Sequence, residues 1–155
     1  MNFDEHGNLT PSQPIESDLR EVEDVLVFNE HRRRLFEELL SFVDQLLALD
    51  LSGFHIWLNG SFTTLKPKPR DIDAVIFISY REHAAKCQIL SELKKKFSGL
   101  IDAYFVPVCP ESHPDFRLYN SDRIDWLFLF SSDRDRRKKG FLEIKFIQKN
   151  GKADN

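Results

Sequence analysis

Two aspartates separated by one residue are the first feature of this chain that suggests chemistry. Asp71 and Asp73 stand at the entrance to an apolar run, 72–78, whose composition is typical of a central β-strand. Residues two apart in a strand point to the same side, so the two carboxylates project together. Such carboxylates repel each other unless a cation lies between them, and oxygen ligands suit Mg²⁺ or Mn²⁺. The pair therefore predicts a divalent-metal site.

A glycine and a serine precede the two aspartates. The run 54–58 is apolar and predicts a strand that delivers Gly60 and Ser61 to a turn. Glycine permits a close backbone approach, and the serine hydroxyl and backbone N–H groups can hold a phosphate oxygen. The connecting loop carries three basic residues, where the charge of a triphosphate would lie: Lys66, Lys68 and Arg70. The residues predicted to bind a nucleotide are Gly60, Ser61, Lys66 and Arg70.

The order of apolar strand, Gly-Ser, short spacer and Asp-x-Asp at the next strand resembles the signature of the nucleotidyltransferase superfamily. The closest likeness is to its minimal, single-domain bacterial members. More narrowly, the chain resembles an uncharacterised bacterial family of small proteins with this fold. The matching segments are FDEHGNLTP, LNGSFTTLKPKPRDIDAVIF and SSDRDRRKKGFLEI. The resemblance implies an α/β (α+β) fold, a small mixed sheet flanked by helices.

Active members of that superfamily carry a third carboxylate on a neighbouring strand, which completes a two-metal site. Asp102, at the start of a third predicted strand, is the best candidate, and Asp122 and Asp125 are weaker ones. The resemblance thus implies that Asp71, Asp73 and Asp102 are catalytic and bind Mg²⁺ or Mn²⁺. The structural alternative is a plain Gly-Ser turn, with Asp73 paired to a basic side chain and Asp102 merely opening a strand.

Two functions follow as expectations from the resemblance. The first is metal-dependent transfer of a nucleoside monophosphate from an NTP to a hydroxyl of a protein or RNA, within a toxin–antitoxin or phage-defence system. The second is a catalytically weak or inactive binding module, acting as an antitoxin or regulatory partner of a protein encoded nearby. Length supports the second, since 155 residues leave no room for the helical domain that grips base and acceptor in larger members.

The elements that must position these residues follow from hydrophobic periodicity. The pattern predicts helices at about 29–49, 82–97 and 122–130, and strands at 54–58, 72–78, 101–108 and 141–147. We expect the strands that carry Trp57, Val75 and Tyr104 to be neighbours in one sheet, with the first helix packed on it.

The ends of the chain differ in composition from its centre. Residues 1–18 are rich in Pro, Asn, Ser and Asp and predict a leader, in which Phe3 and Leu9 anchor at most a short extended segment. Residues 19–148 form the expected nucleotidyltransferase-like domain, and 149–155 a polar tail. No apolar run approaches the ~20 residues that span a bilayer, so no membrane partner is expected.

Charge and cysteine usage complete the expectations. The net charge of −3 argues against a protein that coats nucleic acid. Two cationic clusters, 31–34 and 133–139, predict solvated surfaces, with contact to phosphate, a partner or RNA as the alternative. Cys87 and Cys109 lack metal-site spacing and predict reduced thiols, as in the cytoplasm.

Overall fold

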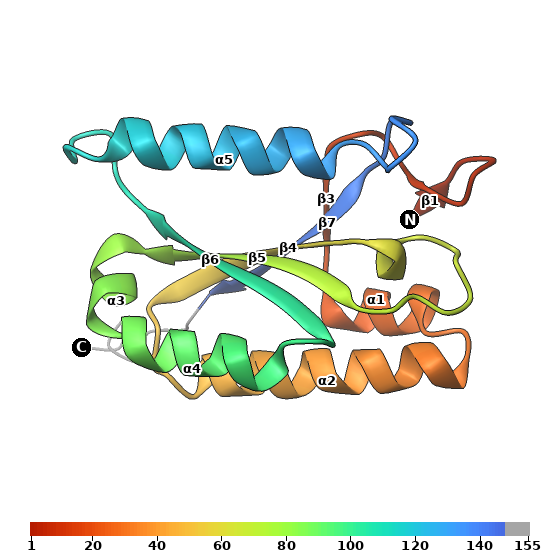
Figure 1. Cartoon of the computed structure of the whole chain (residues 1–155), viewed down its shortest axis with the longest axis horizontal. Helices are drawn as coiled ribbons and strands as arrows, with labels where there is room; N and C mark the ends of the chain where they lie inside the picture. Colours follow the sequence, from red (N-terminus) through yellow and green to blue (C-terminus); the bar gives the residue numbers. More distant parts are fainter. Residues whose placement is uncertain (148–155) are drawn as a thin grey trace.

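The computed structural model describes residues 1–147 and shows a mixed α+β fold, as predicted (Figure 1). The strands are β1 (Asn2–Phe3), β2 (Leu9–Thr10), β3 (Pro14–Ser17), β4 (Gly53–Asn59), β5 (Ile72–Ser79), β6 (Ile101–Val108) and β7 (Phe141–Ile147). The helices are α1 (Leu19–Leu26), α2 (Glu30–Leu47), α3 (Tyr80–Ala85), α4 (Cys87–Phe97) and α5 (Phe116–Phe130), with a 3₁₀ turn, η1 (Ser61–Thr63).

The principal sheet has five strands in the order β3-β7-β4-β5-β6. The two outer pairs, β3 with β7 and β5 with β6, are parallel, whereas β4 is antiparallel to both of its neighbours. Trp57 lies opposite Val75, and Val75 lies opposite Tyr104. This register confirms that the three predicted strands are neighbours in one sheet.

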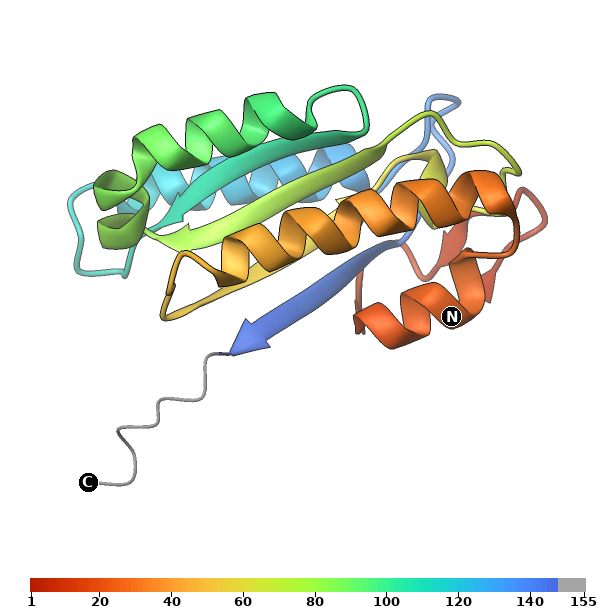
Figure 2. The same cartoon turned by 90° about the horizontal axis from the view of Figure 1, so that it is seen from below.

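Helices cover both faces of this sheet (Figure 1). Figure 2 shows α2 and α4 side by side across one face, with α1 beyond them, while α5 crosses the opposite face. Asn29 caps α2, because its side-chain oxygen accepts the backbone N–H of Arg32 at 2.8 Å. A large core fills the α2 side, and a smaller aromatic core around Trp57, Phe77 and Phe141 lies beneath α5.

Two predicted helices have different bounds in the structure. The helix expected at 82–97 is divided at Lys86 into α3 and α4. The last helix was expected from Asp122 but begins at Phe116, so α5 runs along the sheet for 15 residues. Residues 116–121 were missed because charged and polar residues interrupt the apolar period there.

The N-terminal segment corrects our expectation of a leader. Residues 14–17 form β3 and pair with β7 in register from Pro14–Phe141 to Ser17–Ile144. β1 and β2 form a small antiparallel hairpin, and Leu9 is fully buried. Gly140 donates its N–H to the carbonyl of Leu9 at 2.7 Å, and a Cβ on Gly140 would lie 2.3 Å from the Pro11 carbonyl oxygen. Residues 1–18 are thus an integral part of the domain.

Two remaining expectations concern the surface and the chain end. Among residues 1–147, no helix has the length and apolarity needed to cross a bilayer. Both cysteines are free thiols, exposed Cys87 on α4 and buried Cys109 directly after β6. The predicted polar tail, 149–155, lies outside the described residues.

Candidate functional site

The end of β4 and the starts of β5 and β6 meet at one edge of the sheet. Asn59 lies opposite Asp73, and Asp73 lies opposite Asp102, so the three side chains stand in a row on the α5 face. Asp71, one residue before β5, joins them at the wall of a cavity of about 580 Å³. The structure therefore brings together all three carboxylates that the sequence nominated.

The carboxylates form a negative patch with little direct compensation. Burial, together with repulsion from Asp71 and Asp102, raises the pKa of Asp73, and the cations Lys139 and Arg134 oppose this effect. Neither Asp71 nor Asp73 forms an ion pair with any Lys or Arg that the structure describes. Within residues 1–147, no group of three or more His, Cys, Asp and Glu side chains is already arranged to hold a metal.

The Gly-Ser turn closes tightly over one of these carboxylates. Gly60 has φ of 87°, a conformation that other residues rarely adopt, and a Cβ there would lie 3.1 Å from Oδ2 of Asp73. Ser61 then opens the 3₁₀ turn η1 and lines the cavity. The glycine is therefore required both by its backbone conformation and by the close approach to Asp73.

Arg32 fixes the turn from behind and corrects our expectation of a solvated 31–34 cluster. Its side chain is fully buried and donates only to backbone carbonyl oxygens. The acceptors are Leu26 at 3.0 Å, Ser61 at 3.3 Å, Phe62 at 2.8 Å, Thr64 at 2.6 Å and Lys66 at 2.5 Å. Burial lowers the pKa of Arg32 to about 10, so it stays charged at neutral pH. Arg32 thus ties the 61–66 segment to α2.

Lys139 corrects the expectation of a solvated 133–139 loop. Its side chain is buried, and Nζ donates to the carbonyl oxygen of Gly60 at 2.8 Å. Burial lowers the pKa of Lys139 to about 8, although Asp73 and Asp133 favour its charged form. This role was not predictable from the sequence, because a lysine beside four other basic residues looks like a solubilising charge.

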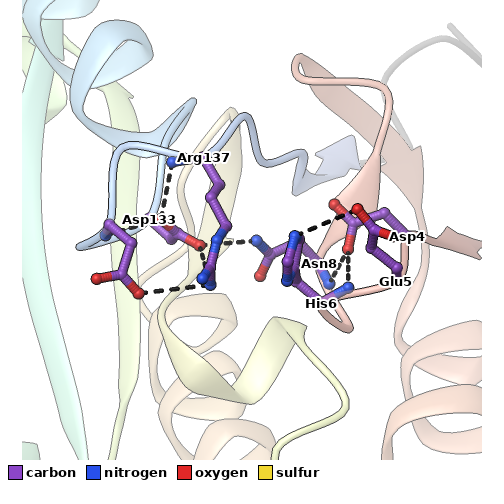
Figure 3. A network of polar contacts seen from close by, with 7 residues as sticks. Asp4, Glu5, His6, Asn8, Asp133 and Arg137 are labelled. Carbon is purple, nitrogen blue, oxygen red and sulfur yellow. Dashed lines mark hydrogen bonds and ion pairs between the residues drawn. The ribbon is translucent and has the colours of Figure 1, made fainter.

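The rest of the same loop meets the N-terminal turn at the cavity rim (Figure 3). Nδ2 of the buried Asn8 donates to Oδ2 of Asp133 at 2.9 Å. Asp4 accepts the backbone N–H groups of His6 at 2.8 Å and Asn8 at 3.0 Å, which fixes the shape of the turn. His6 and Asn8 thereby reach the cavity wall, a pair of residues that sequence reasoning missed.

The chain matches one known protein family. Residues 1–145 match the family described as "Family of unknown function (DUF6932)". The chain belongs to this family. No curated protein and no solved structure matches the chain. The matched region of DUF6932 contains every residue that lines the cavity, from His6 to Lys139.

Of the two basic residues predicted to bind a nucleotide, Lys66 and Arg70, one lies at this cavity. Lys66 lines it, as does Arg134 from the late loop. Arg70 is exposed and does not belong to the described residues that line the cavity. Asp122 lines a separate hollow beside Tyr104, and Asp125 lines neither. The cavity thus combines the acidic row and the Gly-Ser turn with Lys66, Arg134 and Lys139.

Proposed function

We propose that the protein is a metal-dependent nucleotidyltransferase. It moves a nucleoside monophosphate from an NTP to a hydroxyl of a protein or RNA, in the cytoplasm and in a toxin–antitoxin or phage-defence setting. One observation carries the proposal: Asp71, Asp73 and Asp102 share a cavity with the tight Gly60-Ser61 turn. The volume of about 580 Å³ lies within the range of small-molecule sites.

The donor chemistry fits Mg²⁺ or Mn²⁺. Mg²⁺ takes one or two carboxylates and completes its shell with waters and substrate phosphates. The carboxylates that would hold it are Asp71, Asp73 and Asp102, and burial together with repulsion from the other two raises the pKa of Asp73. Bound metal would supply charge neutralisation for the triphosphate and for the attacking oxygen.

The chain's own groups account for the remaining requirements of the transfer. The acceptor oxygen attacks the α-phosphorus, the bond from that phosphorus to the bridging oxygen breaks, and pyrophosphate leaves with the electron pair. The Gly60-Ser61 backbone and the cations of Lys66 and Arg134 hold the phosphates in line, while Asp102 polarises the acceptor hydroxyl and accepts its proton. Positioning and charge stabilisation supply most of the rate in reactions of this class, so no histidine base is required.

A transfer assay tests the proposal directly. The protein is incubated with each α-labelled NTP, Mg²⁺ or Mn²⁺, and either total RNA or the protein encoded beside it. Label should enter a macromolecule, and Asp73→Ala should abolish this. Asp24→Asn, an exposed carboxylate on α1, is the matched control and should transfer normally. Absence of transfer with the genomic partner, all four NTPs and both metals would reject the enzyme.

A second function is favoured by the outer surface of α5. Leu118 and Phe128 are 67% and 82% exposed, so one helix presents large apolar side chains to solvent. A binding module with little or no activity, acting as an antitoxin or regulatory partner, would use such a face. Co-purification with the neighbouring gene product that is lost in Phe128→Glu, without any transfer activity, would select this function.

A further inference from the structure

We propose that Trp126 and Tyr104 form a base-stacking subsite for the nucleotide. The inference rests on the proposed function and names the group that recognises the substrate's base. Trp126 comes from α5 and Tyr104 from β6, and both line the same cavity as the carboxylate row. Neither residue belongs to the site that was predicted from the sequence.

The indole of Trp126 is supported from behind. Its ring packs edge-on against Phe130, with centroids 5.5 Å apart, and Phe130 belongs to the buried core beneath α5. Trp126 is only partly buried, so part of its surface faces the cavity. A rigid, half-exposed aromatic ring at a cavity wall is the arrangement on which nucleic-acid bases stack.

Tyr104 connects this ring to the acidic row. Its centroid lies 4.7 Å from that of Trp126, and Oη donates to Oδ2 of Asp102 at 3.3 Å. The ammonium of Lys94 lies 4.1 Å over the Tyr104 ring and covers one of its faces. Tyr104 therefore orients the wall, and Trp126 is the residue left to stack on a base.

The wall of the cavity consequently combines two kinds of lining. Carboxylates, the Gly60-Ser61 turn and cations make up its polar part, as phosphates and their metal require. Trp126, Leu129 and Phe130 add an aromatic and apolar part. This combination matches a nucleoside triphosphate better than a free polyphosphate, and stacking of this kind tolerates any base.

The test compares ligands with and without a base. Titration calorimetry with Mg²⁺ measures binding of α,β-methylene ATP and of tripolyphosphate to the wild type, Trp126→Phe and Trp126→Leu. We expect Trp126→Leu to weaken the nucleotide by roughly tenfold or more and to leave tripolyphosphate unchanged. Trp126→Phe, which keeps an aromatic face, should bind the nucleotide nearly as the wild type does. Unchanged tripolyphosphate binding also shows that the variants are folded.

Fluorescence provides the independent readout. Trp57 is buried, so quenching of the wild-type emission by nucleotide would come from Trp126 and should disappear in Trp126→Phe although calorimetry still shows binding. Equal affinity of Trp126→Leu and the wild type for the nucleotide would overturn the stacking subsite alone. Failure of the wild type to bind both ligands would overturn the proposed function, and the subsite with it.

Discussion

The ammonium nitrogen of Lys139 lies 2.8 Å from the carbonyl oxygen of Gly60, which ties the approach to β7 to the turn after β4. A charged donor on a buried carbonyl makes a stronger hydrogen bond than a neutral one. The same cation interacts favourably with Asp73, whose pKa is raised by burial and by its acidic neighbours. Lys139 thus couples the geometry of the turn to the charge of the acidic row.

Lys139 should make stability depend on pH in the alkaline range. Burial lowers its pKa from 10.5 to about 8, so between these values the unfolded chain binds more protons than the folded one. Stability therefore rises as pH increases through this window, by on the order of 3 kcal/mol from this group. Urea unfolding at pH 7.5 and pH 10 should show that rise relative to Lys139→Met. Parallel changes in the two proteins would contradict it.

Arg32 should be essential for stability. Its removal strands several buried carbonyl oxygens, so Arg32→Met is expected to cost about 3–5 kcal/mol. Arg32→Lys should rescue little, because a single ammonium cannot replace a planar group with five donors. Arg34, exposed on the same helix, provides the control, and Arg34→Met should change the free energy of unfolding by less than about 0.5 kcal/mol. Similar losses for Arg32→Met and Arg34→Met would refute the assignment.

Asp73 should oppose folding at neutral pH. Its pKa is higher in the folded protein than the 3.8 of the unfolded chain. Asp73 therefore contributes to stability below pH 3.8, and this contribution is lost as pH rises through its pKa in the folded protein. Asp73→Asn is therefore expected to raise the Tm of the metal-free protein at pH 7, by a small amount because solvent screens a half-buried carboxylate. The gain should vanish at pH 3. A lower Tm for the variant at pH 7 would show that Asp73 is structurally required.

Bound divalent metal should make the wild type more stable than the aspartate variants. Mg²⁺ or Mn²⁺ at about 100 times its Kd is expected to stabilise the wild type by about 2.7 kcal/mol. The double variant Asp71→Asn, Asp73→Asn should show no such shift in a thermal scan, and no heat in calorimetry with metal and a non-hydrolysable NTP. EDTA should return the wild type to its starting Tm. Equal metal responses in both proteins would remove the site from consideration.

Local patterns were sufficient for the centre of the fold. The apolar runs that became β4, β5 and β6, separated by clear turn signals, predicted the strands, whereas the resemblance implied that Asp102 would join Asp71 and Asp73 at one edge. β3 was not predictable in this way, because Pro14–Ser17 has no sustained alternation and owes its conformation to pairing with β7.

The burial of Arg32 and of Lys139 was not predicted from the sequence, for two different reasons. Arg32 lies three and four residues before Leu35 and Phe36, on the buried face of α2, so helical periodicity contained the signal that one basic residue points inward. Lys139 carried no such signal, since its burial depends on the N-terminal turn and the Gly60 carbonyl meeting it from distant parts of the sequence.

The position of β7 between β3 and β4 has a consequence for biosynthesis. A ribosome releases the strands from the N-terminus, so β7 emerges after the other strands of this sheet and must insert between β3 and β4. Until then β3 has no strand to pair with. Pairings so distant in sequence form slowly. Asp133 and Lys139 reach the cavity only as β7 docks, so a nascent chain has no finished pocket. Chemistry at this site would begin only after translation has passed β7.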